Sequence, residues 1–320
     1  MSGARRDAPL QAASSPHVHS DGPSHRRLLA DVLVALAPVG AAAVWFFRWE
    51  AVRQVAVACL TAVLVEAGCA RLRRRPSTLG DGSACITGLI LAFSLPPALP
   101  SHATAIGAAV AIALGKMVFG GLGQNVFNPA MVGRAFLAAS FPALMGSWSE
   151  PYTLHAVTGA TPLASARSGG EVPGAWPLLV GATGGCVGET SAAAIVAGGA
   201  WLLWRRAADW RPTAGMLLAV AAIAAAESLW KGPGPALGVA GHLTSGAVLL
   251  GAFFIVTDPV TCPLTSTGRW TFGAGVGSLT MVIRLFGGYP EGVMYAVLVF
   301  NGLTPLLERA TKPIPIGGAR

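Results

Sequence analysis

Apolar runs long enough to cross or nearly cross a lipid bilayer follow one another along most of this chain, which restricts it to one class of fold. The runs cover residues 28–47, 51–70, 83–95, 102–119, 129–146, 177–204, 212–230, 236–257, 270–286 and 291–307. Only 11% of the 320 residues are charged and 53% are hydrophobic, so the chain lacks the polar surface of a water-soluble protein. We therefore predict an all-α polytopic membrane protein with about ten transmembrane helices.

The basic residues indicate how these helices are oriented. They gather at 26–27, 71–75, 205–211, 269 and 309–312, and ten crossings place all of these groups on one side, with Lys231 as the main exception. Because positive residues favour the cytoplasmic side, we expect both termini there and the polar stretch 147–176 outside. The net charge of +8 therefore reflects topology, and nucleic acid is not an expected partner.

These patterns divide the chain into five parts. We predict cytoplasmic tails at 1–27 and 309–320, membrane halves of five helices each at 28–146 and 177–308, and an extracytoplasmic loop at 147–176. The run 83–95 is too short for a full crossing and is expected to be a half-helix that ends at Leu95-Pro96-Pro97. Segments 87–96 and 245–259 resemble each other weakly, and such paired interruptions are typical of inverted repeats.

A glycine-rich break precedes the fifth apolar run. Asn125 lies in this break, and Asn128 followed by Pro129 predicts an N-cap and a first-turn proline that restart the helix. The amide groups at such a helix start can bind an anion or an electron-rich carbonyl. The alternative is a tight turn between packed helices.

Carboxylates within apolar runs are costly and therefore mark candidate functional positions. Asp258, Glu66 and Glu189 are the candidates for an ion or proton pathway. Each also has a structural alternative: Asp258 as a helix cap, Glu66 as the partner of a nearby arginine, and Glu189 as a first-turn acid. We expect Arg284 and Glu291 to form a structural ion pair. No C-x-x-C pair occurs among the cysteines, so no metal site or cluster bound by this chain alone is expected.

Six motifs occur in an order that resembles the NqrB/RnfD family, the membrane subunits of the sodium-pumping NADH:quinone oxidoreductase and of the related Rnf electron-transport complex. The motifs are KMVFGGLGQNVFNPAMVGRAF (116–136), TGATPL (158–163), GETS (188–191), FFIVTDPVT (253–261), GRWTFGAGVG (268–277) and YPEGVMYAVLVFNGLTPLLE (289–308). The resemblance extends from about Ser15 to Glu308, and the short N-terminal tail with Ser15-Pro16-His17 is more similar to RnfD than to NqrB.

The resemblance implies a covalent flavin on the outer loop. In this family a flavin transferase esterifies the second threonine of a [Ser/Thr]-Gly-Ala-Thr motif to the phosphate of FMN. Here the motif is Thr158, Gly159, Ala160 and Thr161, with Thr161 as the acceptor. The chain departs from the family at His155, where an acidic residue is usual, which puts the rate of attachment in question. The resemblance also allows a non-covalent riboflavin near the broken helices.

The fold implied by the resemblance is two five-helix inverted repeats with broken helices, similar to the urea-channel architecture. The implied function is electron relay between NADH and ferredoxin or flavodoxin, coupled to Na⁺ or H⁺ movement across a bacterial inner membrane. Implied partners are other Rnf subunits, including an extracytoplasmic FMN-carrying subunit and membrane subunits with an iron–sulfur cluster, together with membrane lipid. The alternatives are an NqrB-like quinone-reducing subunit, a urea-type channel or transporter, and a purely structural membrane subunit.

Overall fold

The computed structural model describes residues 25–74, 79–149, 151–152, 161–168, 170, 174–181, 183–231, 237–289 and 291–312. These residues form helices, turns and extended segments, and no strand occurs among them. In chain order, the elements of the first half are α1 (His25–Leu72), η2 (Leu79–Asp81), α2 (Ser83–Phe93), α3 (Ser101–Ile112), η3 (Ala113–Met117), α4 (Pro129–Ser140) and α5 (Pro142–Met145). The elements of the second half are α6 (Pro162–Ser168), α7 (Ala175–Val180), α8 (Ala192–Trp204), α9 (Trp210–Lys231), α10 (Gly238–Thr244), α11 (Val248–Leu250), η4 (Gly251–Ile255), α12 (Ser266–Phe286) and α13 (Val293–Ala310).

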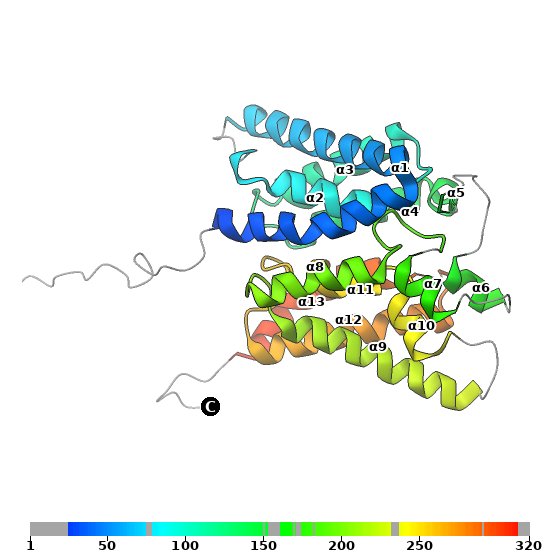
Figure 1. Ribbon diagram of the computed structural model, residues 1–320. Helices are drawn as coiled ribbons and strands as arrows, with labels where there is room; N and C mark the ends of the chain where they lie inside the picture. The colour runs from blue at the N-terminus through cyan, green and yellow to red at the C-terminus, as the bar shows by residue number, and fades with distance from the viewer. Residues whose placement is uncertain are drawn as a thin grey trace, which may run out of the picture.

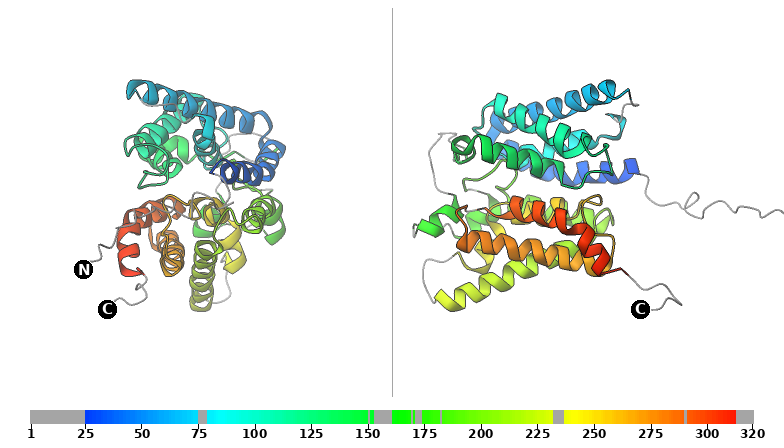
Figure 2. Two further views of the ribbon diagram at one scale, coloured as in Figure 1. Left: turned by 90° about the vertical axis from the view of Figure 1, so that its left-hand side faces the viewer. Right: turned by 180° about the vertical axis from the view of Figure 1, so that it is seen from behind.

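The helices form two packed groups, α1–α4 in one and α8–α13 in the other (Figure 1). The start of α1 and the end of α13 lie at the same end of the molecule, here called the terminal end. Helices α5, α6 and α7 lie at the opposite end, here called the loop end (Figures 1 and 2). All-helical architecture and long apolar helices agree with the predicted membrane protein.

The apolar runs predict most helix positions. Runs 28–47 and 51–70 are the two arms of α1, which reverses direction at Arg48, a residue with a φ of 48° (Figure 1). Within the described chain, Arg27–Leu72 and Trp210–Trp230 are long and apolar enough to cross a membrane. The bent pair Gly238–Thr244 and Val248–Ile255 makes a third if it is one span. The ten-crossing count stays a prediction.

The apolar run 177–204, which we expected to supply one of the ten helices, does not form one continuous helix. The chain is interrupted at Gly181, which has a φ of 107°, and α8 begins only at Ala192. Residues 183–191 are not helical and include a turn at 187–189. Their amide groups bond to the end of α2 instead: Val187 N–H donates to the Leu95 carbonyl at 3.0 Å and Gly188 N–H to the Phe93 carbonyl at 2.8 Å. A tertiary contact therefore replaces local helix formation.

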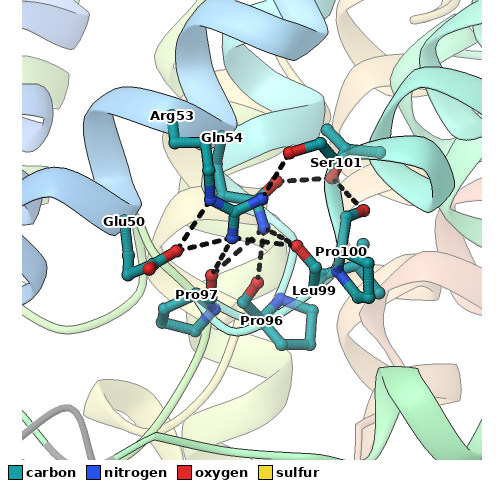
Figure 3. Close-up of polar contacts among 9 residues, drawn as sticks. Glu50, Arg53, Gln54, Pro96, Pro97, Leu99, Pro100 and Ser101 are labelled. Carbon is teal, nitrogen blue, oxygen red and sulfur yellow. Dashed lines mark hydrogen bonds and ion pairs between the residues drawn. The ribbon is translucent and has the colours of Figure 1, made fainter.

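The expected half-helix is present, since α2 has eleven residues and ends at Phe93. The turn that follows exposes carbonyl groups that have to find donors within the protein. Gln54, fully buried on α1, directs its amide nitrogen at the carbonyls of Pro96 (3.2 Å), Pro97 (3.1 Å) and Leu99 (2.7 Å). Arg53 donates to the last two as well, so α1 fixes the break (Figure 3).

Asp209 ties the connection between α8 and α9 to α12 at the terminal end. Its carboxylate accepts hydrogen bonds from Arg211 at 2.9 Å and from Arg269 at 2.5 Å. Partial burial raises the pKa of Asp209, but the hydrogen bonds from Arg211 and Arg269 outweigh that effect and hold the pKa below its usual value.

The two groups approach closely where small residues face each other. A Cβ on Gly198 of α8 would stand 2.0 Å from the Ala35 carbonyl oxygen of α1, so only glycine fits there. Small residues at such contacts let membrane helices pack backbone to backbone.

We predict that Gly198→Ala destabilises the protein by about 1–3 kcal/mol, because the new methyl group overpacks the contact between α8 and α1. The matched control is Gly68→Ala on α1, where a Cβ meets nothing within 4 Å. Thermal unfolding of the detergent-solubilised protein measures the effect. Equal unfolding temperatures for the two variants would contradict this account of the contact.

Candidate functional site

Thr161 caps the start of α6 at the loop end. Its hydroxyl oxygen accepts a hydrogen bond from the Ala164 N–H at 3.2 Å, and its carbonyl accepts from the Ser165 N–H at 2.8 Å. The residue is buried, with 4% of its surface exposed. The other motif residues, Thr158, Gly159 and Ala160, lie outside the described residues, as does His155.

Two contacts fix α6 against the second helix group. Arg167 donates a hydrogen bond to the Gly287 carbonyl, and Leu163 packs so closely on Gly246 that a Cβ there would stand 2.8 Å from the Leu163 side chain. Gly246 has a φ of 66°, a conformation that also favours glycine. The position of Thr161 is therefore set by long-range contacts.

A small cavity lies against Thr161. Its volume is about 20 Å³, and Glu189, Ser245 and Glu291 contribute to its wall. The structure thus brings together the predicted flavin acceptor and one of the predicted ion-pathway carboxylates.

Glu189 and Glu291 share one guanidinium group. Arg134 of α4 lies 3.3 Å from Glu189 Oε1 and 2.5 Å from Glu291 Oε2, and it also contacts the Cys186 sulfur at 3.5 Å. Cys186, Glu189 and Glu291 each offer a potential metal-ligand atom, and these atoms all lie within 4.8 Å of one another. Arg134 comes from the first helix group and the carboxylates come from the second half of the chain, so the cluster joins the two.

The predicted ion pair between Arg284 and Glu291 is wrong. Arg284 directs its two terminal nitrogens at the carbonyls of His242 (2.8 Å) and Ser245 (2.9 Å). Arg284 bonds to these carbonyls because the interruption after α10 exposes them beside α12. Glu291 forms its ion pair with Arg134 and not with Arg284. Sequence proximity predicted the wrong partner.

Asn128 confirms the predicted N-cap of α4. Its side-chain oxygen accepts from the Met131 N–H at 3.3 Å, and Pro129 occupies the first turn. The Asn128 N–H donates to Asn301 Oδ1 at 2.9 Å, and its amide nitrogen lies 3.4 Å from Asp258 Oδ2. The restart of α4 is thus bound to the second helix group.

Asp258 does not cap a helix, contrary to one alternative, since the next helix begins at Ser266 with Thr265 as its cap. Its carboxylate instead accepts from the Val260 N–H at 3.0 Å and the Thr261 hydroxyl at 3.2 Å. These bonds stabilise a local turn after η4. Asp258 therefore holds two interrupted segments together, its own and that of Asn128.

A larger cavity of about 120 Å³ adjoins these residues. Asn125, Asn128 and Asp258 line it together with Lys116, and the first turn of α1 contributes Leu28 and Leu29, which places the cavity toward the terminal end. The structure therefore brings three predicted site residues to one cavity. Mostly apolar walls with a few polar groups are typical of small-molecule sites.

Glu66 lies beside this cavity in a separate buried pair. Lys116 Nζ is 2.7 Å from Glu66 Oε2 and 2.6 Å from the Ser83 hydroxyl, and both charged residues are almost fully buried. One partner of Glu66 within the described chain is therefore a lysine fifty positions away. The pairing of Glu66 with an arginine of its own loop stays a prediction.

Sequence reasoning did not single out Arg134, Lys116 or Asn301 as site residues. All three are buried, and all three stand within the motifs that carry the family resemblance. The available signal was a basic or amide side chain inside an apolar run, which is costly without a partner. Carboxylates alone do not reveal the groups that pair with them.

The chain is similar to known proteins over nearly its whole length. The model of the NQR2, RnfD, RnfE family matches residues 11–317. The D component of the Na⁺-translocating ferredoxin:NAD⁺ oxidoreductase complex of Acetobacterium woodii is 41% identical over 307 residues, which cover 95% of this chain and 94% of the relative.

Two further relatives have related names. The D component of the proton-translocating ferredoxin:NAD⁺ oxidoreductase complex of Clostridium ljungdahlii is 37% identical over 324 residues, covering 96% of both chains. The D component of the ion-translocating oxidoreductase complex of Salmonella paratyphi B is 40% identical over 344 residues, covering 95% of this chain and 97% of the relative. The residues that line both cavities therefore lie within the matched part of the chain.

We predict that Arg134→Met destabilises the protein by about 3–5 kcal/mol, because it leaves two buried carboxylates without their shared partner. Arg134→Lys should lose less stability than Arg134→Met, since lysine supplies a point charge but not two directed donors. Thermal unfolding and the yield of assembled protein measure both. Wild-type stability of Arg134→Met would show that the cluster is not structurally coupled.

Proposed function

Since the chain belongs to the NQR2, RnfD, RnfE family, we propose that it is the flavin-carrying membrane subunit of an ion-translocating oxidoreductase complex of the Rnf type. In this role it relays electrons between NADH and ferredoxin or flavodoxin through FMN on Thr161, coupled to movement of Na⁺ or H⁺. The observation that supports the role most directly is full-length similarity to proteins named as the D component of such complexes. It contributes to an enzyme complex and is not catalytic alone.

The residues around Thr161 fit an FMN phosphoester. Esterification replaces the hydroxyl proton, and no described residue accepts a hydrogen bond from that proton, so the ester keeps the helix-capping bond to Ala164. The cavity of about 20 Å³ is too small for a three-ring flavin, which typically needs a site of several hundred Å³. The ring would therefore extend away from this cavity while the phosphate stays at its edge.

The chain's own residues would hold the attachment point still. Leu163 and Arg167 fix α6, and Thr161 starts that helix. Covalently bound flavin would supply one- or two-electron transfer at this position. A fixed attachment keeps the distance to neighbouring electron carriers constant.

The proposed orientation places the terminal end in the cytoplasm. The end of α1, the end of α8 and the start of α12 lie at the terminal end (Figure 1). Arg71, Arg205 and Arg269 belong to or adjoin these helix ends, which follows the positive-inside rule. The loop end with Thr161 would then be periplasmic in a bacterial inner membrane. A flavin transferase and an extracytoplasmic FMN-carrying subunit would have access to it there.

The interrupted helices support the proposed pair of inverted five-helix repeats. Helix α2 of the first group ends against Val187 and Gly188, and the turn after η4 of the second group binds Asn128. Each interruption therefore contacts a segment from the other half. Membrane subunits with an iron–sulfur cluster would pack, together with lipid, on the exposed apolar faces of these repeats.

We predict that Thr161→Ala abolishes covalent flavin while the protein still assembles into its complex. The checking measurement is the mass of the peptide covering residues 155–167 from native complex, in a host that has the transferase. Thr183→Ala is the matched control, because Thr183 lines the same cavity and is not the acceptor. An unmodified wild-type peptide would refute the attachment site.

We further propose that the cavity of about 120 Å³ holds part of a non-covalent riboflavin, with Asn125 and Asn128 as polar contacts. Asn125→Ala should weaken this binding by roughly fivefold, about the effect of one lost hydrogen bond. Acid-extractable flavin per complex, measured against flavin concentration, tests it. Unchanged extractable flavin would place riboflavin elsewhere or exclude it.

A further inference from the structure

The buried cluster at the loop end contains more acceptor oxygen than its donors satisfy. Arg134 contacts one oxygen of Glu189 and one oxygen of Glu291. The other oxygen of Glu189, Oε2, is buried and has no hydrogen-bond donor among the described residues. Leaving such an atom without a partner is costly in a low-dielectric interior.

The unused acceptors border the cavity next to Thr161. Glu189 and Ser245 both line it, and the Ser245 hydroxyl is likewise buried without a partner among the described residues. Glu291 Oε1 lies 3.4 Å from the point where a Cβ on Gly246 would stand, and Gly246 also lines the cavity. A cavity of about 20 Å³ has room for one water-sized occupant, since roughly 10–15 Å³ is enough for a water molecule.

The charges around the cavity favour a positive occupant. Within hydrogen-bonding distance, two carboxylates share the single guanidinium of Arg134, which leaves one negative charge. Two carboxylates held against the same guanidinium repel each other, and a further cation between them would reduce that repulsion. A positive occupant would therefore balance negative charge and also give the unused oxygen of Glu189 a partner.

The other charged and titratable groups nearby donate no hydrogen bond to the unused oxygen of Glu189. Arg284 of α12 uses both terminal nitrogens on backbone carbonyls. His242 of α10 contacts Glu227 of α9 at 3.0 Å, and Cys186 contacts Arg134. Arg284 offsets part of the negative charge at the cavity, so the cavity suits a monovalent occupant better than a divalent one.

We propose that Glu189 and Glu291 bind one exchangeable monovalent cation, Na⁺ or a proton, in the cavity beside Thr161. Carboxylate and hydroxyl oxygens are suitable ligands for a hard cation, and the same carboxylate oxygens can share a proton. The cation enters from and returns to water, with no bond to carbon formed or broken. This site deepens the proposed function, because it gives ion translocation a defined binding position next to the flavin acceptor.

The experiment uses the purified complex in wild-type form and with Glu189→Gln. One arm measures equilibrium binding of radioactive sodium, with choline chloride holding the ionic strength constant. The other arm follows the infrared band of protonated carboxyl groups during a pH titration without Na⁺. We expect Glu189→Gln to lose either one bound Na⁺ per complex or one protonated carboxyl group. Asp31→Asn is the control, because Asp31 pairs with Arg205 outside this cavity and should change neither signal.

A second variant keeps the test decisive if Glu189→Gln fails to assemble. Ser245→Ala removes a hydroxyl that has no partner in the described chain, so it should fold normally. It should weaken Na⁺ binding by roughly tenfold, or shift the carboxyl titration by about one pH unit. Wild-type behaviour of this variant in both arms, or of an assembled Glu189→Gln, would overturn the site and leave a water molecule as the occupant.

The result is separable from the flavin assignment. The mass of the peptide that contains Thr161 is measured on the same samples. An unmodified peptide would refute the flavin proposal and leave the cation measurement valid, whereas a modified peptide with no cation effect would refute only the site proposed here.

Discussion

Every polar group buried among these apolar helices has to find its partner within the protein, and this requirement determines how the chain is interrupted. The turn after α2 exists because Gln54 and Arg53 supply donors for its carbonyls. The amides of Val187 and Gly188 satisfy the end of the same helix from the far half of the sequence. An apolar solvent gives no other source of hydrogen bonds, so each break needs a specific tertiary partner.

The candidate sites follow from these breaks. Asn128 restarts α4 where it meets Asn301 and Asp258, and Asn128 and Asp258 line the larger cavity. Arg134 extends from α4 toward the opposite end, where the interruption before α8 presents Glu189. One helix therefore connects both candidate sites. A shift of α4 would therefore change the polar contacts at each of them.

Local pattern predicted the features that depend on local chemistry. Hydrophobic run length located most helices, and Asn128 with Pro129 predicted the start of α4 because an N-cap is made by neighbouring residues. Pattern failed where the choice depended on tertiary partners. The segment before α8 is apolar enough for a helix but bonds to α2 instead, and Glu291 selects Arg134 over Arg284, which is much nearer in sequence. No periodicity encodes such choices, because the competing partners have similar chemistry and differ only in where the fold places them.

The proximity of Thr161 to the carboxylate cluster has an electrostatic consequence. A phosphodiester on Thr161 would add one negative charge at the edge of a cavity that Glu189 and Glu291 already make electronegative. Like charges in a poorly hydrated site raise each other's energy, so this charge would strengthen cation binding in the cavity. By linkage the bound cation would stabilise added negative charge near Thr161 to the same extent. The proposed flavin and the proposed cation would therefore influence each other through distance and charge, without a large movement of the helices.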